Sequence, residues 1–357
     1  MANKFCRNIS NTYRFNRNNQ SELYYKPCCW VPHNKLITNA QSLVDAQREI
    51  AQDILKNPRV NCIECINRER TNFRKSGRRT ALDDIPEDAV DGDPYILELQ
   101  LDTNCNAACS ICGPHFSSLW QKQLKIVPLE DTKINELHDQ LINLISFDLI
   151  KKIKFFGGEP LLTESHLKVL DYVTNPLDCE LLYSTNGSIF PNKKILSVWE
   201  KFKKVNLSFS IDAIQDQFEY IRWPLKWSRV ESNLINVAQQ LSNIEVQVHC
   251  TVNPMNVLYI TELEQWIDQI QKTHNINIGY SFSSCSGVWG IDAMPPGLMT
   301  KILNQYPSDH PIIGIIKSVN QSIGKYKDLQ QDMDKLDITR KLDWKKTFQD
   351  VAGYFSE

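Results

Sequence analysis

Residues 95–112 of this 357-residue chain read YILELQLDTNCNAACSIC. The first seven residues, 95–101, alternate in the two-residue period of a β-strand. A loop that carries Cys105, Cys109 and Cys112 follows this strand at once. The stretch therefore predicts three thiols on one loop at the carboxyl end of a strand, which is where barrel enzymes carry their chemistry.

Strand-like and helix-like segments alternate after this loop. The further strand patterns lie at 152–156, 180–185, 205–211, 244–252 and 276–282. The helical patterns lie at 134–145, 164–173, 228–241 and 260–271. This alternation predicts an α/β fold in which about six βα units form a parallel sheet, curled into a partial (β/α)6 TIM-like barrel.

The ends of the chain differ from this central part. Residues 74–94 combine RKSGRR, an acidic stretch and DGDP, which is typical of a solvated linker. We therefore expect three parts, a small cysteine-rich N-terminal domain, the barrel and a helical C-terminal extension, at 1–80, 95–290 and 291–357. The extension is expected to pack on the outside of the barrel, with a lid or partner-docking role as the alternatives.

The composition excludes several classes of protein. The chain is 42% hydrophobic and 23% charged with a net charge of -2, which does not favour nucleic acid as a partner. No apolar run approaches the roughly 18 residues that span a bilayer, and residues 1–17 are polar. We expect a cytoplasmic protein that binds no membrane. Its eleven cysteines, without a secretory signal, favour metal or redox chemistry over disulfides.

The cysteine loop has the spacing C-x3-C-x2-C. Thiolates are soft ligands that suit iron–sulfur clusters, and a 4Fe-4S cluster held by three cysteines keeps one iron open for another ligand. The alternatives are a loop of inert, buried cysteines and a zinc site completed by His115.

This spacing after a first strand resembles the signature of the radical S-adenosylmethionine (SAM) superfamily. One departure is Ile111, where the family usually has an aromatic residue. The resemblance implies a 4Fe-4S cluster on the three cysteines, with SAM bound to the open iron. An external donor would supply an electron, SAM would split into methionine and a 5'-deoxyadenosyl radical, and the radical would abstract a hydrogen atom from the substrate.

Further polar motifs follow the next strands in the order that the superfamily uses. They are the GGE motif, an STNG turn, an SFSID strand end and a following arginine. The resemblance assigns SAM binding to Gly157, Gly158, Glu159, Ser184, Asn186, Ser210, Asp212 and Arg222. The glycines would let the backbone approach the SAM amino group, and the arginine would pair with the SAM carboxylate. Any one of these motifs alone is also compatible with an ordinary turn.

The N-terminal segment offers five more thiols. They are Cys6, Cys28, Cys29, Cys62 and Cys65. An early cysteine, a PCC, and a CxxC followed by Glu69 and Arg70 resemble the auxiliary-cluster module, twitch or SPASM-like, of certain radical SAM proteins, although here the module precedes the barrel. The resemblance implies an auxiliary 4Fe-4S cluster in which either Cys28 or Cys29 is a ligand. A zinc ribbon on the same residues is the alternative.

The auxiliary module favours one substrate class. The module resembles those of enzymes that mature peptides. The resemblance implies a ribosomally made precursor peptide, one residue of which is epimerised, cross-linked or excised from the backbone. A peptide-recognition partner protein would then deliver the peptide. The alternatives are a small metabolite, such as a sugar or nucleoside precursor, and a non-enzymatic iron–sulfur carrier or scaffold. A carrier has no need of the GGE motif or of Arg222.

Three isolated cysteines remain. Cys285 lies at the end of the sixth predicted strand, near Tyr280, where a hydrogen-atom donor could reach a radical, although a buried thiol is the ordinary reading. Cys179 and Cys250 lie within or beside strand patterns and are expected in the core.

Overall fold

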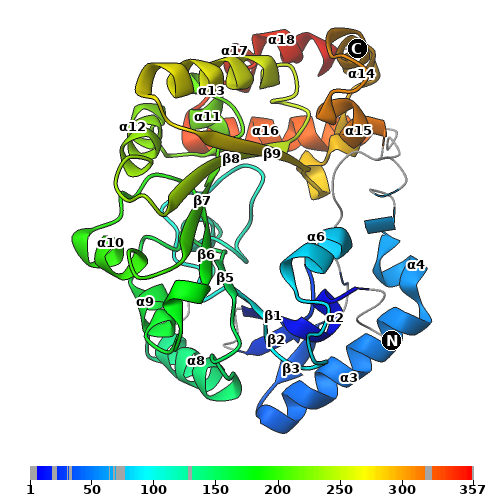
Figure 1. Cartoon of the computed structure of the whole chain (residues 1–357). Helices are drawn as coiled ribbons and strands as arrows, with labels where there is room; N and C mark the ends of the chain where they lie inside the picture. Colours follow the sequence, from blue (N-terminus) through cyan, green and yellow to red (C-terminus); the bar gives the residue numbers. More distant parts are fainter. Residues whose placement is uncertain are drawn as a thin grey trace. The chain divides into compact units, whose positions relative to one another are not determined.

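The computed structural model describes residues 6–17, 22–29, 31, 34–63, 65–66, 69, 77–127, 131–317 and 324–355. Arg70 of the N-terminal motif lies outside the described residues. The chain is a mixed α/β protein whose strands follow the order β3-β2-β1-β4-β5-β6-β7-β8-β9 in one sheet (Figure 1). The sheet order has two ends, so the predicted α/β class is confirmed, with a sheet that is not closed.

The strands are β1 Thr12–Arg17, β2 Leu23–Lys26, β3 Lys35–Ile37, β4 Ile96–Leu99, β5 Lys152–Phe155, β6 Glu180–Thr185, β7 Lys204–Ser210, β8 Ile244–Val252 and β9 Ile278–Ser284. The last six of these coincide with the six predicted strands to within about two residues at either end. Strand periodicity in the sequence therefore predicted the central strands well, because each has one or both faces buried.

The chain divides into two compact units. Unit 1 contains Met1–Cys105, Pro114–Thr185 and Pro191–Leu207, and unit 2 contains Asn106–Gly113, Asn186–Phe190 and Ser208–Glu357. The helices of unit 1 are α2 Asn8–Asn11, α3 Ala40–Lys56, α4 Pro58–Asn61, α6 Gly77–Asp84, α7 Ser118–Gln123, α8 Asp131–Leu144, α9 Ser165–Leu170 and α10 Lys193–Trp199. Helices α8 to α10 lie along one side of β5 and β6 (Figure 1).

In unit 1, β4 is hydrogen-bonded on both sides to parallel strands, to β1 and to β5. Strands β2 and β3 continue the sheet beyond β1 as antiparallel neighbours. Tyr13 and Phe15 of β1 are buried, and the apolar side of α3 packs on β2 and β3. The N-terminal segment thus extends the same sheet as the predicted barrel, because its alternating apolar residues cover an edge of β4 that would otherwise be unpaired. The three predicted domain bounds stay a prediction.

The predicted linker is wrong over part of its length. Residues Gly77–Asp84 form α6, and Ala81 and Ile85 are buried. Asp84 pairs with Lys152 of β5 at 3.0 Å. The charged residues dominated the sequence pattern, but the two apolar residues four positions apart give the segment a face that packs.

Unit 2 is built on β8 and β9, which pair in parallel from Val246↔Ile278 to Val252↔Ser284. Its helices are α11 Gln215–Ile221, α12 Trp227–Val237, α13 Ile260–His274, α14 Pro296–Gln305, α15 Pro311–Lys317, α16 Lys325–Arg340, α17 Trp344–Thr347 and α18 Gln349–Ala352. Trp227 and Trp266 join α12 to α13 by an edge contact of 4.8 Å between ring centroids. The predicted helical character of the C-terminal stretch is confirmed.

No helix in the described ranges is both long and apolar enough to cross a membrane.

Candidate functional site

The cysteine loop is held by backbone hydrogen bonds on both sides of Cys109. In unit 2, the Ala108 amide donates to the Trp223 carbonyl and the Ser110 amide donates to the Ile221 carbonyl, each at 2.8 Å. Cys109 is 6% exposed, whereas Cys112 is exposed. Cys105 belongs to unit 1 and is half-buried. The structure therefore fixes the backbone around Cys109 most firmly.

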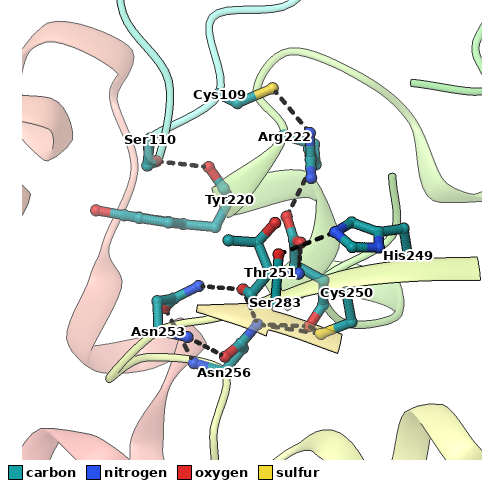
Figure 2. A network of polar contacts seen from close by, with 11 residues as sticks. Cys109, Ser110, Tyr220, Arg222, His249, Cys250, Thr251, Asn253, Asn256 and Ser283 are labelled. Carbon is teal, nitrogen blue, oxygen red and sulfur yellow. Dashed lines mark hydrogen bonds and ion pairs between the residues drawn. The ribbon is translucent and has the colours of Figure 1, made fainter. Parts of the chain in front are cut away.

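Arg222 joins the cysteine loop to the end of β7. Its Nε donates to Asp212 Oδ2 at 2.6 Å, and its Nη1 lies 3.7 Å from Cys109 Sγ (Figure 2). The side chains of Arg222 and Asp212 are 11% and 0% exposed. Burial works against the charged guanidinium, but Asp212 and Cys109 outweigh it and raise the pKa of Arg222, so the arginine remains charged.

The same arginine acts on the thiol that it contacts. Burial raises the pKa of Cys109, and Arg222 opposes this shift through its charge and its hydrogen bond. A thiolate is the form that binds a soft metal. Arg222 is therefore placed to favour the ligand form of Cys109.

The end of β8 and the turn that follows it hold Asp212 from the other side. The Thr251 amide donates to Asp212 Oδ1 at 2.8 Å, and Asn256 Nδ2 donates to the Asp212 carbonyl at 2.9 Å. Asn253 Oδ1 accepts from the Met255 amide at 3.0 Å. The Asn253 amide donates to Asn256 Oδ1 at 2.9 Å, which closes the turn (Figure 2). The sequence interpretation missed these two asparagines, although the NPMN turn directly after β8 was a usable signal. Asp212 is thus occupied on both oxygens by protein groups.

The GGE motif forms a tight turn in unit 1. Gly157 and Gly158 have φ of +76° and +56°, and a Cβ on Gly158 would lie 2.5 Å from the Asn104 carbonyl oxygen. Only glycine fits where two backbones approach this closely. Glu159 is 1% exposed, and its Oε1 accepts from Thr185 Oγ1 at 2.8 Å and from the Leu161 amide at 3.1 Å.

The remaining predicted SAM contacts are spread over both units. Ser184 is half-buried in β6 of unit 1, and Ser210 is half-buried at the end of β7 in unit 2. Asn186, in unit 2, donates from Nδ2 to Asn106 Oδ1 at 3.0 Å. Asn106 in turn donates to Ser188 Oγ at 2.9 Å. The STNG turn is thereby tied to the residue that follows Cys105.

Cys285 shares its surroundings with the Arg222 group. It follows β9 directly, and its amide donates to the Val252 carbonyl at 3.0 Å. Burial, followed by the charge of Asp212, raises the pKa of its thiol to about 12, and Arg222 and Cys112 also act on it. The thiol is thus neutral near pH 7, as a hydrogen-atom donor requires.

The other isolated residues have structural surroundings. Cys179 and Cys250 are fully buried, as predicted. Tyr280 is 41% exposed, and its hydroxyl donates to Glu264.

The N-terminal cysteines fall into two sets in unit 1. Cys6, Cys62 and Cys65 lie within electrostatic range of one another, and burial, with a smaller contribution from the neighbouring thiols, raises the pKa of Cys6 to about 12. Cys29 lies instead beside Cys28, whose hydrogen bond lowers the pKa of Cys29 to about 7. Cys28 and Cys29 are thus not among the thiols that act on Cys6, and the auxiliary ligand set stays a prediction.

The cysteine loop fits an iron–sulfur cluster by the chemistry of its donors. The loop supplies three thiols within eight residues, and a charged arginine favours the thiolate form of one of them. In the part of the chain that the structure describes, no three His, Cys, Asp or Glu side chains are gathered closely enough to hold a single metal ion. The auxiliary cluster and its fourth ligand stay a prediction.

No family model matches the chain. "Molybdenum cofactor biosynthesis protein 1" of Dictyostelium discoideum is 26% identical over 178 residues, which cover 47% of this chain and 26% of that protein. "S-adenosylmethionine-dependent nucleotide dehydratase" of Selenomonas ruminantium is 29% identical over 121 residues, 34% of this chain and 40% of that protein. "GTP 3',8-cyclase" of Syntrophomonas wolfei is 26% identical over 130 residues, which cover 35% of this chain and 36% of that protein.

One of these relatives is named as an enzyme that depends on S-adenosylmethionine. The chain spans only about a quarter to two fifths of the length of the relatives that it matches. Among solved structures, "Native anSMEcpe with bound AdoMet" is similar with a TM-score of 0.40 and 18% identity, over 59% of this chain and 59% of that one. Streptococcus suis SuiB bound to S-adenosylmethionine is similar with a TM-score of 0.39 and 12% identity, over 75% and 50%.

Proposed function

We propose that this chain is a radical SAM enzyme that cleaves SAM reductively and modifies a small anionic metabolite. The observation that carries the SAM chemistry is the buried Arg222, which contacts both Asp212 and the thiol of Cys109. A carrier or scaffold protein would not require a charged arginine that is fixed beside a cluster ligand at the cost of burial.

The residues of the chain would share the work as follows. Cys105, Cys109 and Cys112 would hold the SAM-binding 4Fe-4S cluster, and Glu159 and Arg222 would receive the amino group and the carboxylate of SAM. When bound, the reduced cluster supplies the electron that splits SAM into methionine and a 5'-deoxyadenosyl radical. The electron would come from an external donor. A reducing compartment such as the cytoplasm would keep the cysteines as free thiols.

The substrate class rests on a row of charges across unit 1. Lys26, Arg14, Glu98 and Lys154 are successive cross-strand partners on β2, β1, β4 and β5. Arg14 Nη1 pairs with Glu98 Oε2 at 2.5 Å and Lys154 Nζ with Glu98 Oε1 at 2.9 Å. Two cations thus pair with one carboxylate, and the third, Lys26, donates to the Cys29 carbonyl at 3.3 Å.

The row has donor capacity that this carboxylate does not use. Arg14 Nε is buried and has no hydrogen-bond partner among the residues that the structure describes. The guanidinium also stacks 3.9 Å from the ring centroid of Phe156, directly before the GGE motif. A phosphate or carboxylate group would satisfy both the excess charge and the open donor. The relatives named for a nucleotide or for GTP agree with a phosphate-bearing substrate.

A modified residue of a ribosomally made peptide is the second candidate. The grouping of Cys6, Cys62 and Cys65 favours it, because such an auxiliary module is what the peptide-maturing enzymes carry. In this reading a partner protein delivers the precursor. If the product is an epimer, Cys285 would donate the closing hydrogen atom, since its thiol is neutral and lies near Arg222.

The proposal is tested by anaerobic reconstitution followed by an assay for 5'-deoxyadenosine with a chemical reductant. We expect a 4Fe-4S spectrum and deoxyadenosine formation that rises with the true substrate. Nucleoside triphosphates and precursor peptides are supplied in parallel. Reconstituted protein that binds iron but never cleaves SAM would overturn the radical SAM assignment, and turnover with peptide alone would select the second candidate.

A further inference from the structure

The C-terminal helix α16 ends at the cysteine loop. Its last residue, Arg340, is 6% exposed, and its Nη2 donates to the Ala108 carbonyl oxygen at 2.7 Å. Its Nη1 donates to Ser110 Oγ at 3.4 Å. One guanidinium therefore hydrogen-bonds to the residues on either side of Cys109, although Arg340 lies more than 200 residues later in the sequence.

An aromatic ring and a second chain segment complete this contact. The guanidinium lies 5.1 Å from the centroid of the Trp223 ring. The Trp223 carbonyl accepts from the amide of Ala108, the residue whose own carbonyl Arg340 holds. Ala108 is therefore fixed at both its amide and its carbonyl. Charged hydrogen bonds of this kind are worth about twice a neutral one.

The position of Arg340 is itself determined by the helix end. Lys341 has a left-handed φ of +57°, which ends α16 directly after Arg340. Asp337, one turn earlier, accepts from the Tyr220 hydroxyl at 2.8 Å and from the Trp344 amide at 2.8 Å. Tyr220 lies on α11, two residues before Arg222. The same helix end therefore fixes the element that carries Arg222.

We propose that Arg340 is a positioning residue that clamps the cysteine loop and holds Cys109 in place to receive a cluster. In this proposal the C-terminal extension supports the cluster site directly, instead of acting as a lid or as a surface for partner binding. The clamp is a property of the protein without metal, and its consequence for the cluster rests on the proposed function.

The test compares R340Q and R340K with wild type. Both remove the fork that reaches two acceptors at once, but the lysine keeps the charge and one hydrogen bond. In metal-free, reduced protein we expect the alkylation of Cys109 to become about tenfold faster or more in R340Q. The reason is that the loop loses its hydrogen bonds to the charged guanidinium and exposes Cys109 more often. Mass spectrometry measures the alkylation rate. R340K should recover part of the protection.

K335Q is the matched control, because Lys335 is exposed on the same helix and the substitution removes the same charge. Thermal unfolding of each variant identifies a general loss of fold. S110A removes the longer Arg340 contact together with the hydrogen bond from Ser110 Oγ to the Tyr220 carbonyl, and it should raise the alkylation rate of Cys109 less than R340Q does, because the contact of Arg340 with the Ala108 carbonyl remains. After reconstitution, the reduction potential and electron paramagnetic resonance spectrum of the cluster should shift in R340Q and not in K335Q.

Two outcomes separate the clamp from the proposed function. Faster alkylation in R340Q together with a wild-type protein that binds no cluster would leave the clamp standing and overturn the radical SAM proposal. Equal alkylation rates and equal cluster spectra in R340Q and wild type would overturn the clamp, and SAM cleavage in both would leave the proposed function intact.

Discussion

Two regions of this molecule place cysteines beside an arginine–carboxylate pair, and they do so differently. In unit 2, the pair Arg222–Asp212 beside Cys109 is buried, with exposed fractions of 11% and 0%. In unit 1, the pair Arg78–Glu69, which acts on Cys62, is exposed by 26% and 13%. The first pair is held by the end of β8 and by the turn that follows it, whereas Arg78 of the second pair lies on the short helix α6.

This difference in burial indicates which of the two pairs belongs to a rigid site. A buried ion pair costs desolvation and persists only when its geometry is fixed by other contacts, so it is poor evidence for stability and better evidence for a rigid site. A partly exposed pair loses less hydration on folding and can rearrange when a ligand arrives. We therefore expect the cysteine loop to be formed before its cluster binds, and the N-terminal cysteines to be ordered by theirs.

The largest effect is expected from removing one of the two cysteine sets. Replacing Cys105, Cys109 and Cys112 by Ala should abolish SAM cleavage but leave the N-terminal metal, because the two sets do not share ligands. The iron content should fall from about eight to about four atoms for each chain if both clusters have four irons. Undiminished deoxyadenosine formation in this variant would contradict the assignment, and stoichiometric zinc in it would identify a zinc ribbon.

A smaller but direct contrast comes from breaking the buried pair. Asp212→Asn leaves the buried Arg222 without its counter-charge and should lower the free energy of unfolding by about 3–5 kcal/mol. Urea unfolding of metal-free protein measures this loss. Asp216→Asn, at an exposed position four residues later, is the control and should change little. Equal effects of the two variants would show that the Arg222 pair is not rigid.

The charge row of unit 1 predicts a dependence on pH. Burial alone would raise the pKa of Glu98, but Lys154 and Arg14 hold it at about 2, below its unfolded value of 4.5. Stability from this group is therefore complete above pH 4.5 and is lost as the pH falls towards 2, by about 3 kcal/mol in all. Unfolding measured from about pH 5 to about pH 2.5 should show this slope in wild type and in E87Q, whose glutamate is exposed, but not in E98Q.

The smallest effect is expected at the N-terminal pair. Arg78→Gln should lower the stability of metal-free protein by no more than about 1 kcal/mol, because the Arg78–Glu69 pair is partly exposed and water screens its attraction. Thermal unfolding with and without bound iron gives the comparison. A loss as large as that of Asp212→Asn would mean that the two regions are built alike.

The sequence predicted the strands of the central sheet better than the N-terminal strands and the helix α6. Strands β6 and β8 match their predicted bounds because their alternation is continuous, from Glu180 to Thr185 and from Ile244 to Val252. Strands β1 to β3 were missed, since the many cysteines and polar residues near them favoured a metal module over a sheet edge. The helix at Gly77–Asp84 was missed because its two buried apolar residues are outnumbered by charges.

The sequence by itself determined the C-x3-C-x2-C spacing, the GGE turn and the strands that carry them, because each is encoded by neighbouring residues. Only the tertiary structure decided that Arg222 contacts Cys109, 113 positions away, and that Arg340 holds Ala108 from a distance of 232 positions. The local sequence around an arginine does not show whether its side chain is solvated or buried. Its role is set by the desolvation and the partners that folding imposes, and these depend on contacts between segments that no local pattern records.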